Sequence, residues 1–105
     1  MINKYYIYRA SCKAHNKKTQ ELAEYLKKFS RIEVQFSESF TPQDLLREIK
    51  DFVFRINSQH RGRDIDVVMH DFAGNINIVF SDNPKSGECV ANIVLNPIDK
   101  TIVSL

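Results

Sequence analysis

The stretch FTPQDLLREIKDFVFRINSQHRG, from Phe40 to Gly62, carries the strongest secondary-structure signal in the chain. Thr41 is a typical N-cap, Pro42 suits the first helical position, and Asp44 stands where a capping-box acid is expected. Apolar residues then recur at helical spacing, at Leu45, Ile49, Phe52 and Ile56. The pattern predicts an amphipathic helix, with Gly62 supplying the left-handed residue that ends it.

A second helix is expected on the N-terminal side, between about Asn16 and Phe29. Its apolar stripe has the spacing i, i+3, i+4, i+7 and consists of Leu22, Tyr25, Leu26 and Phe29. Lys17 and Lys18 lie unfavourably at the positive end of a helix dipole, which makes Thr19 the expected N-cap. The residues before Thr19 would then form a basic loop.

The segments around these helices have the alternation or β-branched composition of strands. They are residues 2–8, 32–36, 64–72, 76–81, 88–95 and 101–105. The expected order β-α-β-α-β-β-β-β indicates an α+β fold with two helices on a mixed, mostly antiparallel sheet, in a single domain spanning 1–105. The helix between the first two strands predicts that they pair in parallel, through a right-handed crossover. Short connections after the second helix predict an antiparallel meander, with a turn around Gly74.

The amino-acid composition favours an ordinary globular domain over a membrane-spanning or disulfide-rich protein. The hydrophobic fraction is 43% and the charged fraction 27%, as in ordinary globular domains. No apolar run approaches the roughly 20 residues that a membrane span needs, and the first residues do not resemble a signal peptide. Cys12 and Cys89 are isolated, which is typical of reduced thiols rather than a disulfide framework or a zinc cluster. We therefore expect a cytoplasmic protein without membrane contact, metal or cofactor.

Charge is distributed unevenly along the chain. Residues 1–31 hold eight Lys or Arg and two acids, whereas residues 32–105 hold seven Lys or Arg and eleven acids. Such asymmetry favours surfaces of opposite potential and contact with a charged macromolecule.

The acidic candidate site lies in HRGRDIDVVMHD, residues 60–71. The expected partner-binding residues are Asp64, Asp66, His70 and Asp71, and the weaker members of the set are Glu38, Asp44, Asp82 and Glu88. On one strand face Asp64 and Asp66 would be about 6.6 Å apart, close enough to share a metal, whereas Asp66 and His70 would be about 13 Å apart. An acidic strand face that meets a basic partner is the favoured interpretation.

The basic candidate site combines cations and aromatic rings, as nucleic-acid binding requires. Its expected residues are Tyr8, Lys13, Lys17 and Lys18. Alternation places Lys4, Tyr6 and Tyr8 on one strand face and Tyr5 and Ile7 on the other, so at least one tyrosine should enter the core. His60 and His70 would supply the acid and base if this site cleaved RNA.

Catalytic signals are otherwise weak. Cys12 and His15 could form a nucleophilic pair, but no orienting partner is evident, and no phosphate-binding or hydrolase motif occurs. The favoured hypothesis is a non-enzymatic protein that binds and inhibits another macromolecule with a basic surface, such as an immunity protein against a toxin or an inhibitor of a defence complex. The alternative is an RNA-binding protein or small ribonuclease. A homodimer through the strand 101–105 is a third expectation, because that strand has few charges to protect its edge.

Overall fold

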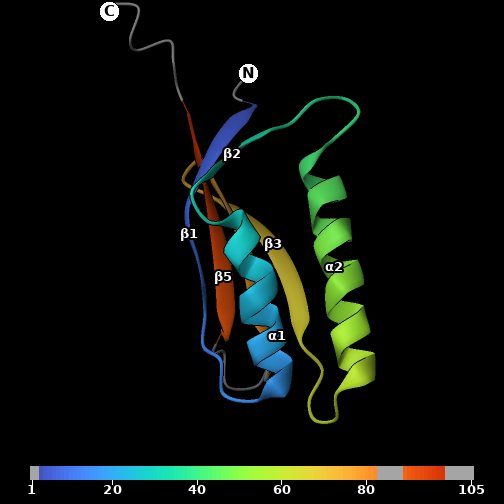
Figure 1. Cartoon of the computed structure of the whole chain (residues 1–105). Helices are drawn as coiled ribbons and strands as arrows, with labels where there is room; N and C mark the ends of the chain where they lie inside the picture. Colours follow the sequence, from blue (N-terminus) through green and yellow to red (C-terminus); the bar gives the residue numbers. More distant parts are fainter. Residues whose placement is uncertain (1–2, 83–88, 99–105) are drawn as a thin grey trace, which may run out of the picture.

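The computed structural model describes residues 3–82 and 89–98, which fold as two helices against one face of a five-stranded sheet (Figure 1). Along the chain the elements are β1 (Lys4–Cys12), α1 (Lys17–Leu26), the 3₁₀ turn η1 (Lys27–Phe29), β2 (Ile32–Gln35), α2 (Pro42–Gln59), β3 (Asp66–Phe72), β4 (Asn75–Ser81) and β5 (Ala91–Pro97). The α+β class and the order of the elements are confirmed. The last expected strand, residues 101–105, lies outside the described residues.

The sheet has the order β2-β1-β5-β4-β3 and is antiparallel throughout. The prediction of a parallel β1–β2 pair is therefore wrong. The chain leaves η1 beside Ile7, whose carbonyl accepts a hydrogen bond from the Arg31 backbone N–H at 2.7 Å. Only Ser30 and Arg31 separate η1 from β2, and Arg31 has a positive φ of 60°. Strand β2 continues in the direction of α1, and it therefore runs antiparallel to β1.

Helix α2 begins as its sequence predicts. Thr41 and Asp44 form a reciprocal capping box, and Pro42 occupies the first turn. The end differs from the prediction, because the C-cap is His60 in an extended conformation. The positive φ of Gly62, 111°, belongs to the turn that follows the helix and does not terminate it.

Helix α1 begins earlier than expected. Asn16 is the N-cap, and its side chain accepts a hydrogen bond from the Thr19 backbone N–H at 2.9 Å. The Thr19 hydroxyl in turn accepts from the Asn16 backbone N–H at 3.0 Å, which completes a capping box. Thr19 is thus the third helical residue rather than the cap, and Lys17 and Lys18 are helical instead of belonging to a loop.

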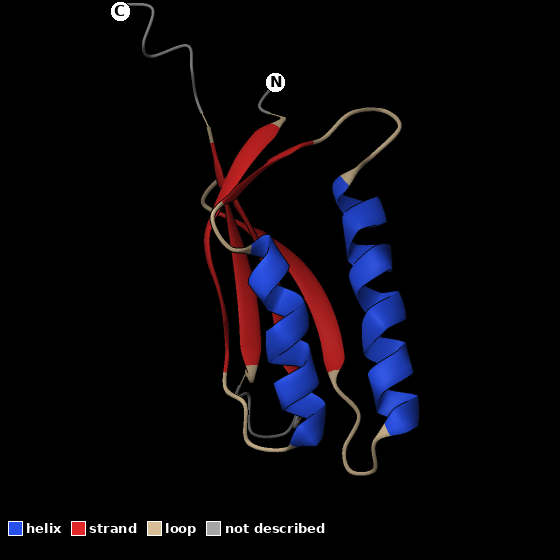
Figure 2. Cartoon of the chain, viewed as in Figure 1, coloured by secondary structure: helices blue, strands red, loops and turns tan. Residues whose placement is uncertain are grey.

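The core fills the space between the helices and the sheet (Figure 2). Alternate residues of each strand point toward the helices, and the most deeply buried are Ile7, Ile78, Phe80, Ile93 and Leu95, all with no exposed area. Both helices pack on this face, and within the described residues no helix covers the other face of the sheet. A two-residue turn, with positive φ at Ala73 and Gly74, joins β3 to β4 as the sequence predicts.

Candidate functional site

The face of the sheet opposite the helices, here called the uncovered face, carries unusually exposed apolar side chains. Among the described residues four large hydrophobic side chains are exposed, and three of them lie on this face: Tyr8 (68%), Val68 (46%) and Phe72 (75%). Their placement follows from alternation, because Ile7 and Val67 point into the core while their neighbours point outward. Exposed apolar groups gathered on one face often mark an interaction surface.

Polar amides occupy much of the rest of the uncovered face. Asn77 on β4 stands opposite His70 on one side and Val94 on the other, and Asn92 stands opposite Ser11 and Val79. Strands β4 and β5 carry no charged residue, and the aromatic and amide content of the face resembles the composition of protein–protein interfaces. The sequence offers a signal for this face, an asparagine at alternate positions of the late strands, but our sequence analysis did not use it.

The expected acidic site falls along one margin of the sheet. Strand β3 is an edge strand, and Asp66 and His70 point from it onto the uncovered face. Asp64 lies in the loop just before β3, and Asp71 points to the helix side near the end of the strand. All four side chains are exposed, and none forms an ion pair with another residue in the described part of the chain. Together with Phe72 they are called the β3 margin below.

Two of the weaker acidic candidates have structural partners instead. Asp44 accepts hydrogen bonds from the backbone and side chain of Thr41, and these bonds hold the pKa of its carboxyl below the ordinary value. Asp82 lies 3.4 Å from the His15 ring. Glu38 is exposed in the loop before α2, and Glu88 lies outside the described residues.

The basic candidate site is dispersed by the fold. Lys18 is 3% exposed, and its ammonium donates a hydrogen bond to the Arg63 carbonyl at 3.0 Å, so it is part of the packing between α1 and the loop after α2. Lys17 is exposed at the start of α1, on the helix side, whereas Tyr8 is on the uncovered face. Lys13 is exposed just after β1. These four residues therefore do not form one surface.

The two histidines of the ribonuclease hypothesis are not brought together. The His60 Nε2 lies 3.0 Å from Glu21 Oε1 and ties the end of α2 to α1 on the helix side. His70 is exposed on the other side of the sheet. An acid–base pair needs both imidazole rings within hydrogen-bond reach of the same phosphodiester. His60 and His70 lie on opposite sides of the sheet and cannot meet this requirement.

Cys12 and His15 do not form the pair that a nucleophilic site requires. The Cys12 thiol is directed to the Thr19 carbonyl at 3.5 Å, and burial raises its pKa, which disfavours the thiolate. The His15 ring lies between the Lys13 carbonyl and Asp82. Both cysteines are free thiols.

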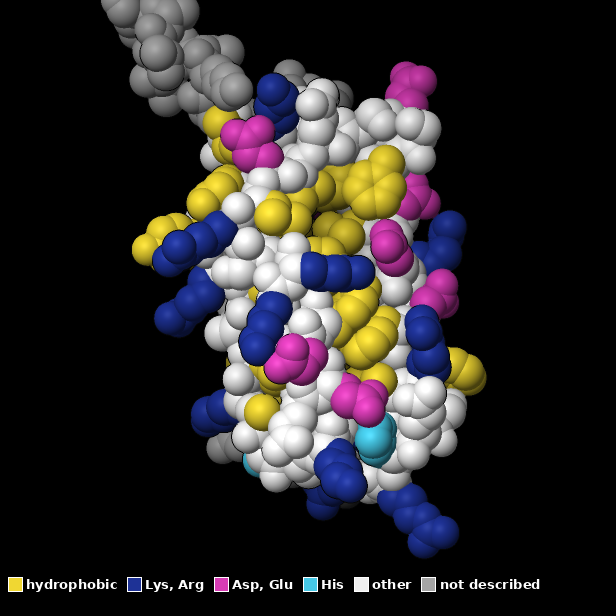
Figure 3. Space-filling model, in the orientation of Figure 1, with side chains coloured by type: hydrophobic (Ala, Val, Ile, Leu, Met, Phe, Trp, Pro, Cys, Tyr) yellow, Lys and Arg dark blue, Asp and Glu magenta, His cyan; other side chains and the backbone are white. Residues whose placement is uncertain are grey.

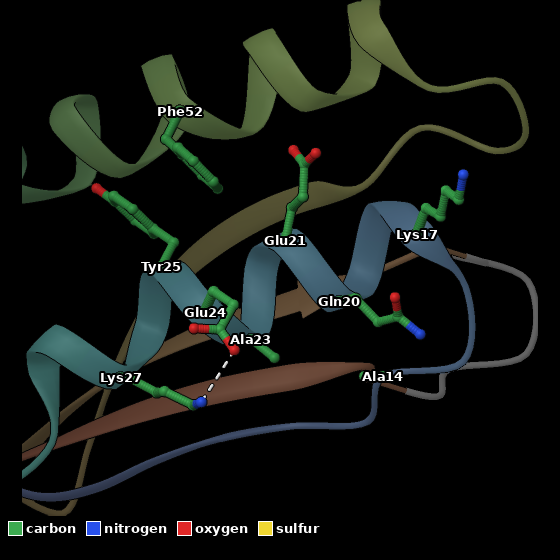
Figure 4. A pocket seen from close by; sticks show the side chains of 9 residues that line it. All are labelled: Ala14, Lys17, Gln20, Glu21, Ala23, Glu24, Tyr25, Lys27 and Phe52. Atoms are coloured by element: carbon green, nitrogen blue, oxygen red, sulfur yellow. Dashed lines mark hydrogen bonds and ion pairs between the residues drawn. The ribbon is translucent and has the colours of Figure 1, made fainter.

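A groove of about 870 Å³ runs along α1 and reaches Phe52 on α2. The Tyr25 and Phe52 rings stack in it at 3.8 Å between centroids, nearly parallel (Figure 4). Figure 3 shows an apolar seam running between the helices, with charged side chains along both sides. Burial, with a smaller contribution from the Glu48 carboxylate, raises the pKa of Tyr25. The stacked rings join α1 to α2, which is a packing role. Cations flank them, with Lys28 Nζ 4.4 Å from the centroid of the Tyr25 ring and the Arg55 guanidinium carbon 5.9 Å from that of Phe52.

Over residues 3–82 and 89–98, no three side chains of the metal-ligating types His, Cys, Asp and Glu gather closely enough to hold an ion. Over the same residues, no helix has the length and apolar character that crossing a bilayer requires.

Comparison with models of protein families, with curated proteins and with solved structures finds no match to this chain.

Proposed function

We propose that this protein is a non-enzymatic inhibitor that binds another protein of basic surface through the β3 margin. The observation that carries the proposal is an exposed aromatic side chain, Phe72 at 75%, on an edge strand that also bears exposed acids with no ion-pair partner among the described residues. Interfaces commonly combine a central aromatic anchor with a polar and charged rim.

The rim chemistry favours a basic partner. Asp64, Asp66 and Asp71 place three carboxylates within one short segment, and none of them forms an ion pair with a residue in the described structure. Carboxylates without an ion-pair partner attract a cationic surface, speed association and fix the docking register. His70 adds a group on the same face that can donate or accept hydrogen bonds.

The rigidity of strand β3 supports an inhibitory role. Strand β3 pairs with β4 along its whole length, from Asp66–Ser81 to Phe72–Asn75, so Asp66 and Asp71 are held on a fixed frame. A rigid acidic strand can occupy a basic cleft that otherwise receives nucleic acid, and it needs no chemistry of its own to do so. The target class is therefore a nuclease toxin or a nucleic-acid-binding defence complex.

The test is affinity capture of the tagged protein from its native cells, read by mass spectrometry. The double variant D64K/D66K reverses two charges in the β3 margin, and the control E48K/D51K makes the same change in net charge at exposed positions of α2. We expect one stoichiometric protein partner with the wild type and the control, and a large loss of it with D64K/D66K. Retention of the partner by D64K/D66K would overturn the assignment of the site.

The apolar anchor is tested separately with Phe72→Ser. Truncating a well-packed interface aromatic typically costs about 2 kcal/mol or more in binding, which is about a thirtyfold loss of affinity. The side chain is exposed in the free protein, so folding should be unaffected. Unchanged affinity of F72S for the captured partner would remove Phe72 from the interface.

A further inference from the structure

A β-bulge in β1 brings two side chains onto the uncovered face at one point. Ile7 pairs with Leu95 and Ala10 pairs with Ile93, so two residues of β1, Tyr8 and Arg9, stand opposite Val94 alone. A regular strand would send one of them into the core. Bulges commonly re-aim a side chain in this way, beside functional sites in particular.

Tyr8 and Arg9 form one side of a hollow of about 270 Å³, here called the bulge pocket. Its lining residues are Tyr8, Arg9, Ser11, Asn92, Val94 and Asn96. The lining contains one cation and no acid, and Arg9 makes no ion pair with any residue that the structure describes. The pocket therefore offers an uncompensated positive charge beside an aromatic ring.

One amide in the pocket, that of Asn92, is oriented as a donor. The Ser11 hydroxyl donates to Asn92 Oδ1 at 2.8 Å, which occupies the amide oxygen and leaves the amide NH₂ group of Asn92 to donate elsewhere. Asn96 adds a second amide at the pocket wall. A guanidinium, two amides and an exposed ring together suit a ligand that is both anionic and flat.

A nucleotide within a single strand combines these two properties. Its base can stack on Tyr8, which is 68% exposed, and its phosphate can accept from Arg9. Lys4 and Tyr6 continue the same face along β1, and Tyr6 stands opposite Asn96. The acids of this face, Glu33 on β2 and Asp66 on β3, lie outside the pocket. Because carboxylates repel phosphates, these acids limit how far a nucleic-acid backbone can extend across the face.

We propose that the bulge pocket binds single-stranded nucleic acid, with a base stacked on Tyr8 and the adjacent phosphate held by Arg9. This site is separate from the β3 margin and shares no residue with it. The two cations on this half of the face, Lys4 and Arg9, set the number of phosphates contacted at about two.

The test uses fluorescence anisotropy of a labelled oligo(U) of about twelve nucleotides with the full chain. Two phosphate contacts predict that affinity falls about sevenfold between about 50 and 200 mM salt. Arg9→Gln should weaken binding and reduce that salt effect to about threefold, because one contact remains. Tyr8→Ala should weaken binding about fivefold or more through lost stacking.

Matched controls remove an aromatic ring and an arginine charge at exposed positions of α2, as Phe54→Ala and Arg55→Gln, and should bind like the wild type. A duplex of the same length should bind more weakly, because its bases are not free to stack. Absence of binding at low salt, equal binding of duplex and single strand, or equal losses in the controls would overturn the proposal. Each of those results would leave the β3-margin proposal standing, since its test uses different residues and a protein ligand.

Discussion

The two faces of the sheet follow the same alternation but have opposite surroundings. Phe80 points toward the helices and has no exposed area, whereas Phe72 points away from them and is 75% exposed. The same contrast holds for Val67 and Val68, which are neighbours on β3 and are 7% and 46% exposed. Burial on one face supplies the hydrophobic stabilisation, so the side chains of the other face are free to serve binding.

The first and largest prediction compares two phenylalanines. Phe80→Ala should lower the free energy of unfolding by about 3–5 kcal/mol, because it removes buried contacts and leaves a cavity. Phe72→Ala should change it by less than about 0.5 kcal/mol, because the ring is already in water. Urea denaturation of both variants measures the difference. Similar losses at the two positions would mean that the uncovered face is packed against something in solution.

The second prediction compares two adjacent lysines. Lys18→Met keeps a long side chain but removes the hydrogen bond to the Arg63 carbonyl, and we expect a loss of about 1 kcal/mol. Lys17→Met alters an exposed residue at the start of α1 and should stay within about 0.5 kcal/mol of the wild type. Thermal or urea unfolding distinguishes them. Equal stability of the two variants would contradict the structural role of Lys18.

The third and smallest predicted effect is the part of the free energy of unfolding that Asp44, at the start of α2, loses at acidic pH. The Asp44 carboxyl has a lowered pKa because the backbone and side chain of Thr41 donate hydrogen bonds to its charged form. Its contribution is fully present above the ordinary pKa of 3.8 and is lost as the pH falls through the lower folded-state value. Asp44→Asn should therefore be less stable than the wild type near neutral pH, and the gap should narrow in acid. A gap that does not change with pH would contradict this account.

Local patterns predicted local structure well. The capping box and apolar stripe predicted the start and the buried face of α2. The alternation of β1 predicted that Tyr8 and Tyr5 lie on opposite faces, and in the structure the Tyr5 ring lies on the core side, 5.5 Å from that of Phe36. The turn at Ala73 and Gly74 was also predictable, since glycine favours the positive φ found there.

Long-range features were not predictable from the sequence. The antiparallel β1–β2 pair depends on where α1 returns to the sheet, beside Ile7. The burial of Lys18 depends on a carbonyl 45 positions away, at Arg63. The bulge depends on the register between β1 and β5, which no local pattern reveals. For the candidate sites, the exposure of the acids on β3 follows from alternation, but the joining of Tyr8, Arg9 and Asn92 in one pocket does not.

The central claim is that one face of the sheet is open to solvent, and methyl NMR with a soluble gadolinium chelate tests it most directly. The account predicts strong relaxation enhancement at the methyl groups of Val68 and little at those of Val67, which is next to it in sequence but buried. Equal protection of the two valines would contradict the account, because it would mean that the face proposed for binding is already covered in the free protein.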